Sequence, residues 1–552
     1  MKRKALKITA LAVAVVAIIV GGVFAKRNDF GLGRNMEIMV NLMHVLSNNF
    51  VDEIDPDKMM KDGADGITSQ LDPYTVFISE ADAADYETMT TGRYGGIGST
   101  IQKRGDYVAI TGPYQGSPAD KAGLIIGDKI IAIESKDMRG ANVSDISKNL
   151  RGEPNSTVTI TVEKLLTGKQ EVLKIRRQLI SKPSIPYAGY VADGVGYICH
   201  TDFTENCYEM MRAAILQLQK SGELKSLIID YRNNGGGLLV EAVDILSLFV
   251  PKGSMVIESR GRGGVSRKYY TRHEPILPDT PLVMLVNNST ASAAEIVTGA
   301  LQDYDRAVII GQRSFGKGLV QTVAPLGYNT KLKYTISKYY IPSGRCIQAI
   351  NYKQDSKAEY VPDSLIKEFK TKCGRKVYDG GGIMPDKKVE LDEVSNFVFA
   401  VYVSNIISEF GDEYFKQNHD KKIDVKSFSI TKSDYAKFKE MAMKHEFTYK
   451  SASRIALEKF RKALEMERNT SLNQTLDTIE KGLNDDKKSA LDTYSKEIID
   501  LINSDIVQRY AYDAGVIANT IMRDKEVKEA IKILNDNAEY KRITTKQDTA
   551  RK

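Results

Sequence analysis

Apolar and polar positions alternate with two different periods in the middle of the chain. Residues 281–286 (PLVMLV) form a short apolar run, which is typical of a buried strand. Small polar residues follow, and apolar residues then recur at helical spacing from about Ser292. These helical positions are Ala293, Ile296, Val297, Ala300, Leu301 and Tyr304. A second apolar run at 307–310 predicts the next strand, and a glycine-broken loop at 311–318 follows it.

The same periods divide the whole chain. Residues 26–86 have a helical pattern, with one apolar face made of Met36, Met39, Val40, Met43 and Leu46. Residues 87–168 alternate short strand-like runs with turns and one helix, and residues 169–386 alternate strands with helices. From residue 387 to 552 glycine becomes scarce and Lys, Glu, Asp and Ala recur at helical spacing. We therefore predict a multidomain α/β protein with N-terminal helices and a C-terminal helical domain.

Composition adds little to this division. The chain has 552 residues, of which 42% are hydrophobic and 27% charged, as in ordinary globular proteins, and its formal net charge is +7. The lysine pairs at 421–422 and 487–488 are typical of a solvated helix surface. We predict no nucleic-acid partner.

The first 25 residues have the pattern of an export signal. Four basic residues precede an apolar run at 8–24, and Val23-Phe24-Ala25 offers a cleavage site for a signal peptidase. The run is also nearly long enough to span a bilayer, so a cleaved signal peptide and a retained signal anchor both stay open. Either one predicts an exported protein, periplasmic or anchored to the inner membrane and facing outward.

Cysteine and histidine give no sign of a metal. The four cysteines are few and irregularly spaced, so they indicate neither a disulfide framework nor a zinc site, although one disulfide is compatible with export. The five histidines match no metal-binding spacing. His200 ends an apolar run in the predicted α/β region, and a structural role is favoured for it over a catalytic one. No metal and no organic cofactor is predicted.

Ser292 and Lys317 are candidates for nucleophile and base. They lie 317 − 292 = 25 residues apart, with one helix and one strand between them, so both side chains can reach the same end of a sheet. A neutral lysine can take the proton of a serine hydroxyl. Its pKa must then fall from about 10.4 to roughly 7 to 8, a cost of about 4 kcal/mol that partial burial can supply. Gln321, four residues further on, could orient the amine.

Other readings of these segments compete. Ser292 and Glu295 fit a capping box that only satisfies the first helical turn. The loop at 311–317 is similar to a phosphate-binding loop, but Gly318 stands where a magnesium-binding Ser or Thr belongs. Ser314-Phe-Gly-Lys317 also spells the SxxK motif of penicillin-interacting enzymes, although its glycines argue against the required helix.

A second loop has the composition of an anion site. Residues 226–230 predict a buried strand, which leads into Arg232-Asn-Asn-Gly-Gly-Gly237 and then into a helix. A strand, a glycine loop and a helix N-terminus together point backbone amides at negative charge. In a peptidase that charge is the tetrahedral intermediate, where one donor contributes on the order of 3 kcal/mol. A plain tight turn is the alternative.

Three segments together resemble the carboxy-terminal processing peptidases, also called tail-specific proteases. They are residues 287–295, 311–321 and 230–237, in the family's order and with its 25-residue spacing. The resemblance implies Ser292 as nucleophile, Lys317 as general base and Gln321 as the residue that orients the lysine. It also implies a ClpP/crotonase-like core. The implied oxyanion hole combines Gly235 or Gly236 with Ala293.

The residues at 94–98 (YGGIG) and 116–133 resemble a PDZ domain. In that case Gly95, Gly96, Ile97 and Gly98 would hold a substrate's terminal carboxylate, and the next strand would pair with the peptide. A bulge or turn is the alternative for the glycines.

The expected organisation is a signal segment at 1–25, helices at 26–86, a PDZ domain at 87–168, a serine peptidase core at 169–386 and a helical domain at 387–552. The predicted function is an exported serine endopeptidase that cleaves proteins near their C-termini, with substrates that carry free C-termini as partners. A non-catalytic PDZ scaffold, or a penicillin-interacting acyltransferase that uses Ser314, remains the alternative. Nothing in the sequence predicts the oligomeric state.

Overall fold

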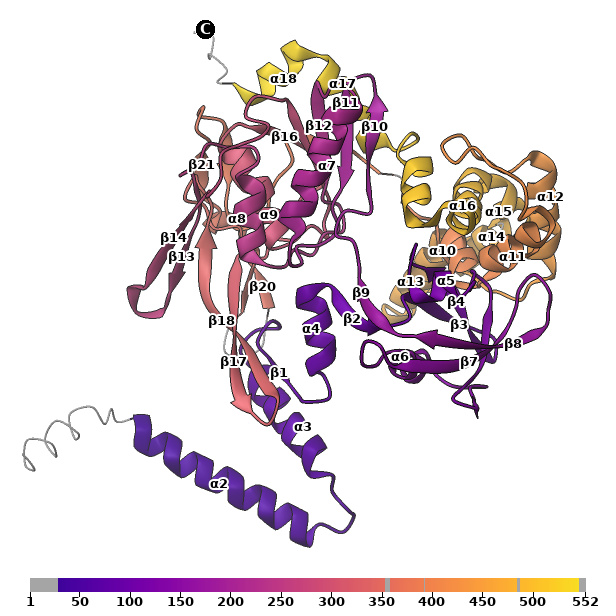
Figure 1. The fold of residues 1–552 in the computed structure, drawn as a ribbon, viewed down its shortest axis with the longest axis horizontal. Coiled ribbons are helices and arrows are strands. Elements are labelled where there is room, and N and C mark those ends of the chain that lie inside the picture. Colours follow the sequence, from indigo (N-terminus) through magenta and orange to yellow (C-terminus); the bar gives the residue numbers. More distant parts are fainter. Residues whose placement is uncertain (1–27, 353–357, 392, 484–486, 546–552) are drawn as a thin grey trace, which may run out of the picture.

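The protein is described from a computed structural model that covers residues 28–352, 358–391, 393–483 and 487–545 (Figure 1). The predicted export signal at 1–25 lies outside the described residues. An α/β core lies between an inserted β domain, a bundle of C-terminal helices and an N-terminal helix that extends away from the body (Figure 1). No helix within the described ranges is both long and apolar enough to cross a bilayer.

A six-stranded sheet forms the centre of the core, in the order β10-β11-β12-β15-β16-β23. All neighbouring strands pair in parallel except β10, which is antiparallel to β11. The strands are β10 (Tyr187–Ala192), β11 (Val195–Cys199), β12 (Ser226–Asp230), β15 (Leu282–Val286), β16 (Ala307–Gly311) and β23 (Lys387–Lys388). β12, β15 and β16 are fully buried, which explains their unbroken apolar sequences.

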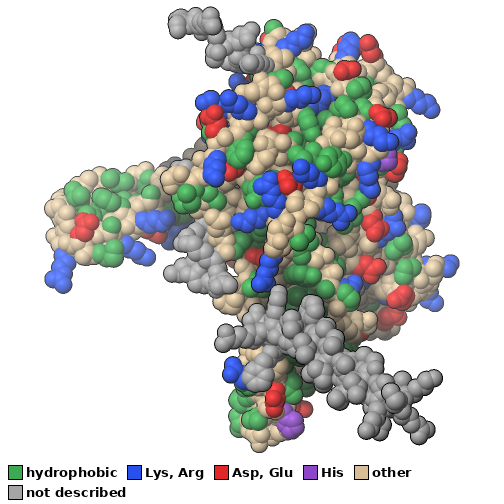
Figure 2. Space-filling view, turned by 90° about the vertical axis from the view of Figure 1, so that its left-hand side faces the viewer, with side chains coloured by type: hydrophobic (Ala, Val, Ile, Leu, Met, Phe, Trp, Pro, Cys, Tyr) green, Lys and Arg blue, Asp and Glu red, His purple; other side chains and the backbone are tan. Residues whose placement is uncertain are grey.

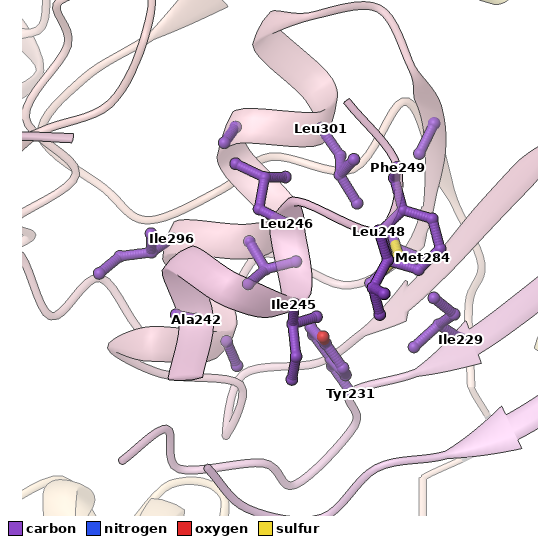
Figure 3. Close-up of a cluster of buried hydrophobic side chains, with 14 of the residues drawn as sticks. Ile229, Tyr231, Ala242, Ile245, Leu246, Leu248, Phe249, Met284, Ile296 and Leu301 are labelled. Carbon is purple, nitrogen blue, oxygen red and sulfur yellow. The ribbon is translucent and has the colours of Figure 1, made fainter. Parts of the chain in front are cut away.

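Helices cover both faces of this sheet. Ile229 and Met284 face a cluster that includes Ala242, Ile245, Ile296 and Leu301, as Figure 3 shows. Their strand neighbours Ile228, Val283 and Leu285 face the opposite way, because side chains alternate along a strand. The helices on the first face are α7 (Cys207–Ser221), α8 (Leu239–Leu246) and α9 (Ala293–Asp303), and those on the second face are α17 (Lys525–Asn535) and α18 (Asn537–Thr544).

A second sheet stands beside the first and has the order β1-β18-β13-β14, with β17 also paired to β18. Its members are β1 (Val76–Ile78), β13 (Met255–Gly261), β14 (Ser266–Tyr270), β17 (Leu319–Gly327) and β18 (Thr330–Tyr340). Small pairs complete the core: β19 (Ile350–Tyr352) with β20 (Ala358–Tyr360) and β21 (Glu368–Lys370) with β22 (Lys376–Tyr378), along with the short helices η1 (Arg262–Gly264) and η2 (Asp363–Leu365). Since β1 pairs with β18, the N-terminal region is joined to the core.

The inserted domain is a sheet of order β3-β4-β5-β7-β8, with β6 paired to β5. Its elements are β3 (Ser99–Arg104), β4 (Tyr107–Pro113), α5 (Pro118–Lys121), β5 (Lys129–Ile133), β6 (Lys136–Asp137), α6 (Val143–Leu150), β7 (Thr157–Glu163) and β8 (Gln170–Arg176). The expected boundary at residue 168 is too early, because β8 pairs with β7 along its whole length. A short ladder of β2 (Arg93–Gly96) with β9 (Gln178–Ser181) connects this domain to the core.

The C-terminal region has two parts. Helices α10, α11, α12, α15 and α16 pack around an apolar cluster that includes Phe397, Phe410, Phe438 and Ile502, and α13 and α14 pair around a smaller one. They are α10 (Asn396–Val403), α11 (Ile406–Asn418), α12 (Lys432–Lys444), α13 (Ala452–Met466), α14 (Asn473–Gly482), α15 (Lys487–Thr493) and α16 (Ser495–Thr520). The chain then returns to the core, where Val527 and Ile533 of α17 pack on the central sheet. The C-terminal region is helical, as predicted, but its last two helices pack on the core instead of joining the bundle.

The bundle also contacts the inserted domain. The Arg104 guanidinium lies 3.1 Å from the Asp412 carboxylate, and the Tyr512 hydroxyl donates to Asp120 at 2.8 Å. Tyr512 has a φ of 55°, and it marks a break inside α16. The C-terminal region thus touches both the inserted domain and the core.

The N-terminal helices are α2 (Asn28–Asn49), α3 (Pro56–Thr68) and α4 (Ala83–Thr91). The apolar face predicted for α2 is exposed, with Met36 at 61% and Val40 at 63%. On the side of the molecule drawn in Figure 2, lysine and arginine side chains are interspersed with acidic and hydrophobic ones. Such mixing is typical of a solvated surface.

Candidate active site

Ser292 lies between β15 and α9, at the carboxyl end of the central sheet. Its φ of 57° and ψ of −117° are unusual for a residue that is not glycine. Two hydrogen bonds fix the turn before it: Ala291 N donates to Asn234 O at 2.9 Å, and Thr290 Oγ1 donates to Tyr231 O at 2.8 Å. Strain of this kind is concentrated at functional sites, and the side chain of Ser292 is only partly buried.

The glycine loop after β12 packs against this turn. Asn233 and Asn287 bond reciprocally, with Asn233 N donating to Asn287 Oδ1 at 3.0 Å and Asn287 Nδ2 donating to Asn233 Oδ1 at 2.9 Å. Gly236 has a φ of 90°, and a Cβ there would lie 2.7 Å from Ala293 N and 2.8 Å from Ser292 Cβ. Only glycine fits this approach.

The hydrogen bonds narrow the choice of oxyanion donors. Gly236 N already donates to Asn234 Oδ1 at 2.9 Å. Within the described part of the chain, the N–H groups of Gly235 and Ala293 have no acceptor. Of the two expected glycine donors, Gly235 is therefore the one that is free to bind an oxyanion, and Gly236 supplies the close packing.

Glu295 connects Ser292 to the loop at 311–318, which carries Lys317. Its buried carboxylate accepts four hydrogen bonds, from Ser292 N, Ser314 Oγ, Gly316 N and Lys317 N, at 2.6 to 2.9 Å. Ser292 and Lys317 share one oxygen, Oε2. Burial raises the pKa of Glu295, and these hydrogen bonds oppose the rise. The Glu295 half of the expected capping box is present, but it also spans the site.

Tyr339 makes a second connection between the same two residues. Its buried hydroxyl lies 2.6 Å from Lys317 O and 3.3 Å from Ser292 O. Glu295 therefore binds the N–H groups of Ser292 and Lys317, and Tyr339 binds their carbonyl groups. The backbones of the two candidate residues are therefore joined through two shared partners at one end of the sheet.

The Lys317 side chain is largely buried, and its amine lies 4.2 Å from the centre of the Tyr74 ring. Burial, and to a smaller extent the charge of Lys333, lowers the pKa of Lys317 to about 8, although the charges of Glu295 and Asp72 oppose this shift. The pKa of Lys333 is itself lowered by burial. Near pH 8, a substantial fraction of the protein molecules therefore has an uncharged Lys317 amine.

Gln321 lies near these residues, but its amide donates to Thr335 Oγ1 at 3.2 Å. In the described ranges the Lys317 amine forms no hydrogen bond with Gln321 or with Ser292 Oγ. The orienting role of Gln321 stays a prediction. Catalytic hydrogen bonds are often long in an unliganded site and shorten only when substrate binds.

The competing readings lose support from the same geometry. Ser314 is buried, donates to Glu295 and accepts from Ile383 N at 2.6 Å, so its hydroxyl is already engaged. Strand β17, rather than the helix of a phosphate-binding loop, follows Gly318. His200 is fully buried against Phe203 and Tyr231, and burial lowers its pKa to about 4. The favoured structural role of His200 is consistent with this position.

No group of three or more His, Cys, Asp or Glu side chains in the described residues is arranged to hold a metal ion.

Three family models match this chain. "Peptidase family S41" matches residues 194–358, "PDZ domain" matches 110–164, and "Probable PDZ-protease, C-terminal helical domain" matches 397–534. A "Probable CtpA-like serine protease" of Staphylococcus aureus (strain COL) is 32% identical over 352 residues, which cover 62% of this chain and 70% of that protein. The chain belongs to peptidase family S41. It is a serine peptidase of the carboxy-terminal processing type.

A "Carboxy-terminal-processing protease" of Bartonella bacilliformis (strain ATCC 35685) is another relative of this S41 peptidase, 34% identical over 306 residues, which cover 54% of this chain and 70% of that protein. Among solved structures, "Photosystem II D1 C-terminal processing protease" is 26% identical over 63% of this chain and 86% of that one, with a TM-score of 0.34. The predicted α/β peptidase core with an inserted PDZ domain and a C-terminal helical domain is confirmed.

A cavity of about 470 Å³ lies between β3 and α6 of the PDZ domain, and α4 (Thr88, Met89) and the core residues Asp202 and Thr204 also line it. Ile97, Gly98, Ile101, Val143 and Leu150 are among the residues that line it. Gly95 and Gly96 were expected to hold a carboxylate there, but both lie in β2 and pair with β9. A Cβ on Gly95 would lie 2.1 Å from Gly152 O, so packing explains this glycine.

Several residues of the S41 site had no functional signal in the sequence. Glu295 was visible as part of a capping box and as the end of the matching segment 287–295, neither of which gave it a role, and Tyr339 only as an aromatic residue in a strand. Tyr74 lies in an N-terminal segment that carried no chemical motif. These residues act through contacts between distant segments, which a local pattern does not contain.

Proposed function

We propose that this S41 peptidase is an exported endopeptidase with a Ser292–Lys317 dyad, and that its PDZ domain selects substrates by their free C-termini. One observation carries the dyad assignment. Glu295 and Tyr339 each bind the backbones of both residues, next to a glycine loop that has a free N–H group. The lowered pKa of Lys317 supports its role as the base.

The chemistry follows from these positions. Neutral Lys317 accepts the proton of Ser292 Oγ as this oxygen attacks the carbonyl carbon of the scissile peptide bond. The N–H groups of Gly235 and Ala293 stabilise the resulting oxyanion. The intermediate collapses to an acyl-enzyme ester when the lysine ammonium gives its proton to the leaving amine. Lys317 then activates the water that hydrolyses the ester.

The cavity in the PDZ domain supports recognition of an apolar C-terminus. Its walls include Ile97, Ile101 and Leu150, which suit an apolar terminal side chain, and Val143 at the start of α6 suits a second one. β3 is an edge strand, so a peptide can pair with it in the cavity. Arg151 also lines this cavity, and its guanidinium pairs with Asp85.

Export rests on the basic and apolar pattern of residues 1–25. Under this proposal the peptidase acts outside the cytoplasm, either released or held by an uncleaved anchor. Expressing the full chain with a C-terminal reporter, followed by fractionation and N-terminal sequencing, tests both points. A cytoplasmic protein that retains Met1 would refute export.

Cleavage of an unstructured protein with an apolar C-terminus tests the dyad. We expect Ser292→Ala and Lys317→Ala to reduce cleavage to below about one thousandth of wild type, since the members of such a dyad act as a unit. Lys331→Ala, on β18 and outside the dyad, is the matched control. Cleavage by Ser292→Ala at the wild-type rate would refute the assignment.

A second substrate separates catalysis from recognition. The same unstructured protein with a glutamate as its last residue should be cleaved with a higher KM, because a charged side chain does not fit an apolar pocket. A folded wild-type protein that binds the apolar C-terminus but cleaves neither substrate would instead support the non-catalytic scaffold.

A further inference from the structure

Arg232 begins the glycine loop at 232–237, and four carboxylate oxygens accept five hydrogen bonds from its guanidinium group. Its Nε lies 3.0 Å from each Asp230 oxygen, and its Nη1 lies 2.7 Å from Asp524 Oδ2 and 2.5 Å from Glu526 Oε2. The last two partners come from the C-terminal region, nearly 300 residues further along the chain. An arginine held by three carboxylates has little freedom to move.

The two C-terminal carboxylates are themselves fixed. Asp524 caps α17, because its Oδ1 accepts from Glu526 N at 2.8 Å and from Val527 N at 3.0 Å, while Oδ2 faces Arg232. Glu526 is fully buried, and its second oxygen, Oε1, has no hydrogen-bond partner among the described residues. Leaving a carboxylate oxygen unpaired and buried is costly, so the contact with Arg232 is the interaction that compensates for it.

The residues that follow Arg232 lead directly to the reacting atoms. Asn233 bonds Asn287 on the nucleophile turn, and Asn234 O accepts from Ala291 N. Gly235, whose N–H is the free donor, comes next. A displacement of Arg232 would therefore move both the oxyanion donor and the turn that carries Ser292.

We propose that Asp524 and Glu526 of the C-terminal region are positioning residues of the peptidase site. Through Arg232 they hold the glycine loop at 232–237, and with it the oxyanion donor Gly235, in place. This inference rests on the proposed Ser292 chemistry. It gives the C-terminal region a direct part in the rate of peptide cleavage, in addition to its packing on the sheet.

The test uses the full-length protein and the double variant Asp524→Asn/Glu526→Gln, which removes both charges with little change in shape. We expect kcat for the unstructured substrate to fall about tenfold to a hundredfold with KM within twofold, because a displaced oxyanion donor acts on the transition state. A fluorophosphonate probe that reacts with Ser292 should label the variant more slowly by a similar factor. A general packing defect would not produce this split between kcat and KM in a folded protein.

Glu529→Gln is the matched control, since Glu529 lies on the same helix and its ion pairs within the described residues are with Lys387, at 3.6 Å, and Lys532, at 3.8 Å, rather than with Arg232. It should keep wild-type kcat and labelling rate. Thermal unfolding establishes whether each variant is folded. If the double variant does not fold, the single variant Asp524→Asn tests the inference, because the asparagine side-chain oxygen can still cap α17. We then expect kcat to fall about threefold.

The inference is overturned if the folded double variant is labelled at the wild-type rate, or if its kcat/KM falls only because KM rises. Failure of the proposed function gives a different result, because wild type itself would then not be labelled at Ser292.

Discussion

The two members of the proposed dyad are held in different ways. The backbone of Ser292 is fixed in a strained turn, and the glycine loop packs within van der Waals distance of it. The backbone of Lys317 is also hydrogen-bonded, but its amine lies over the face of the Tyr74 ring and, among the described residues, forms no hydrogen bond. The position of the nucleophile is thus fixed by the main chain, whereas the protonation of the base is controlled by the burial and the charges around its amine. Substitutions around Ser292 should lower the cleavage rate at every pH, whereas substitutions around Lys317 should shift the midpoint of the pH profile.

Outside the dyad itself, the largest effect is expected for Gly236→Ala. The new Cβ would lie 2.7 Å from Ala291 O and from Ala293 N, at a φ of 90° that alanine disfavours, so the loop must move away from Ser292. We expect kcat to fall by more than about a hundredfold at all pH values. Steady-state kinetics from pH 6 to 10 measure this.

Gly235→Ala is its control, because no heavy atom lies within 4 Å of the Cβ position and the backbone N–H is kept. It should retain activity within a fewfold. Equal losses in both variants would show that the loop tolerates no side chain anywhere, and that the packing of Gly236 on Ser292 is not special.

Glu295→Gln should have the next largest effect. The amide keeps the shape of the carboxylate but turns an NH₂ group toward backbone donors, so at least one of the four hydrogen bonds is lost. We expect a loss of about 1–3 kcal/mol in the free energy of unfolding and a tenfold to hundredfold fall in kcat. Denaturant unfolding and steady-state kinetics measure the two quantities. Glu209→Gln, in the first turn of α7, is the control and should change neither.

The sequence predicted the parts of this site that depend on local pattern. The strand, helix and strand around Ser292 were correct because β15, α9 and β16 are buried and their apolar periods are unbroken. The spacing of Ser292 and Lys317 followed from the same elements. Resemblance to a family was needed to prefer the catalytic interpretation over a capping box.

Other features depend on contacts between distant segments. Gly95 was assigned to a carboxylate site because a local pattern does not show that Gly152 packs on it. The return of α17 to the central sheet was missed, since its apolar face would fit a helical bundle equally well. For the same reason, Arg232 gave no sign that Asp524 and Glu526 would hold it.

On the side of the base, Lys333→Gln should shift the pH profile. For wild type, kcat/KM should rise with pH and reach half its maximum near pH 8, because only neutral Lys317 can accept a proton. The positive charge of Lys333 lowers the pKa of Lys317, so its removal raises that pKa. We expect the midpoint to move up by about 0.5 to 1 unit, with a fewfold loss at pH 7 and none at pH 10.

Lys331→Gln removes a lysine two positions away on β18, near Tyr86 rather than Lys317, and should leave the midpoint unchanged. A loss of activity in Lys333→Gln that is independent of pH would mean that Lys333 acts on the geometry of the site instead of on the charge of the base.

The smallest effect is expected for the ring under the amine. Tyr74→Ala admits water to Lys317, and this raises the pKa of Lys317 because burial is the largest cause of its low value. The same substitution removes a cation–π contact that favours the charged amine by about 0.5–1 kcal/mol, which lowers the pKa. The two effects oppose each other, so the midpoint should rise by no more than about 0.5 unit. Tyr74→Phe keeps the ring and should match wild type. A midpoint that falls in Tyr74→Ala would mean that attraction to the ring, and not exclusion of water, governs the charge of the base.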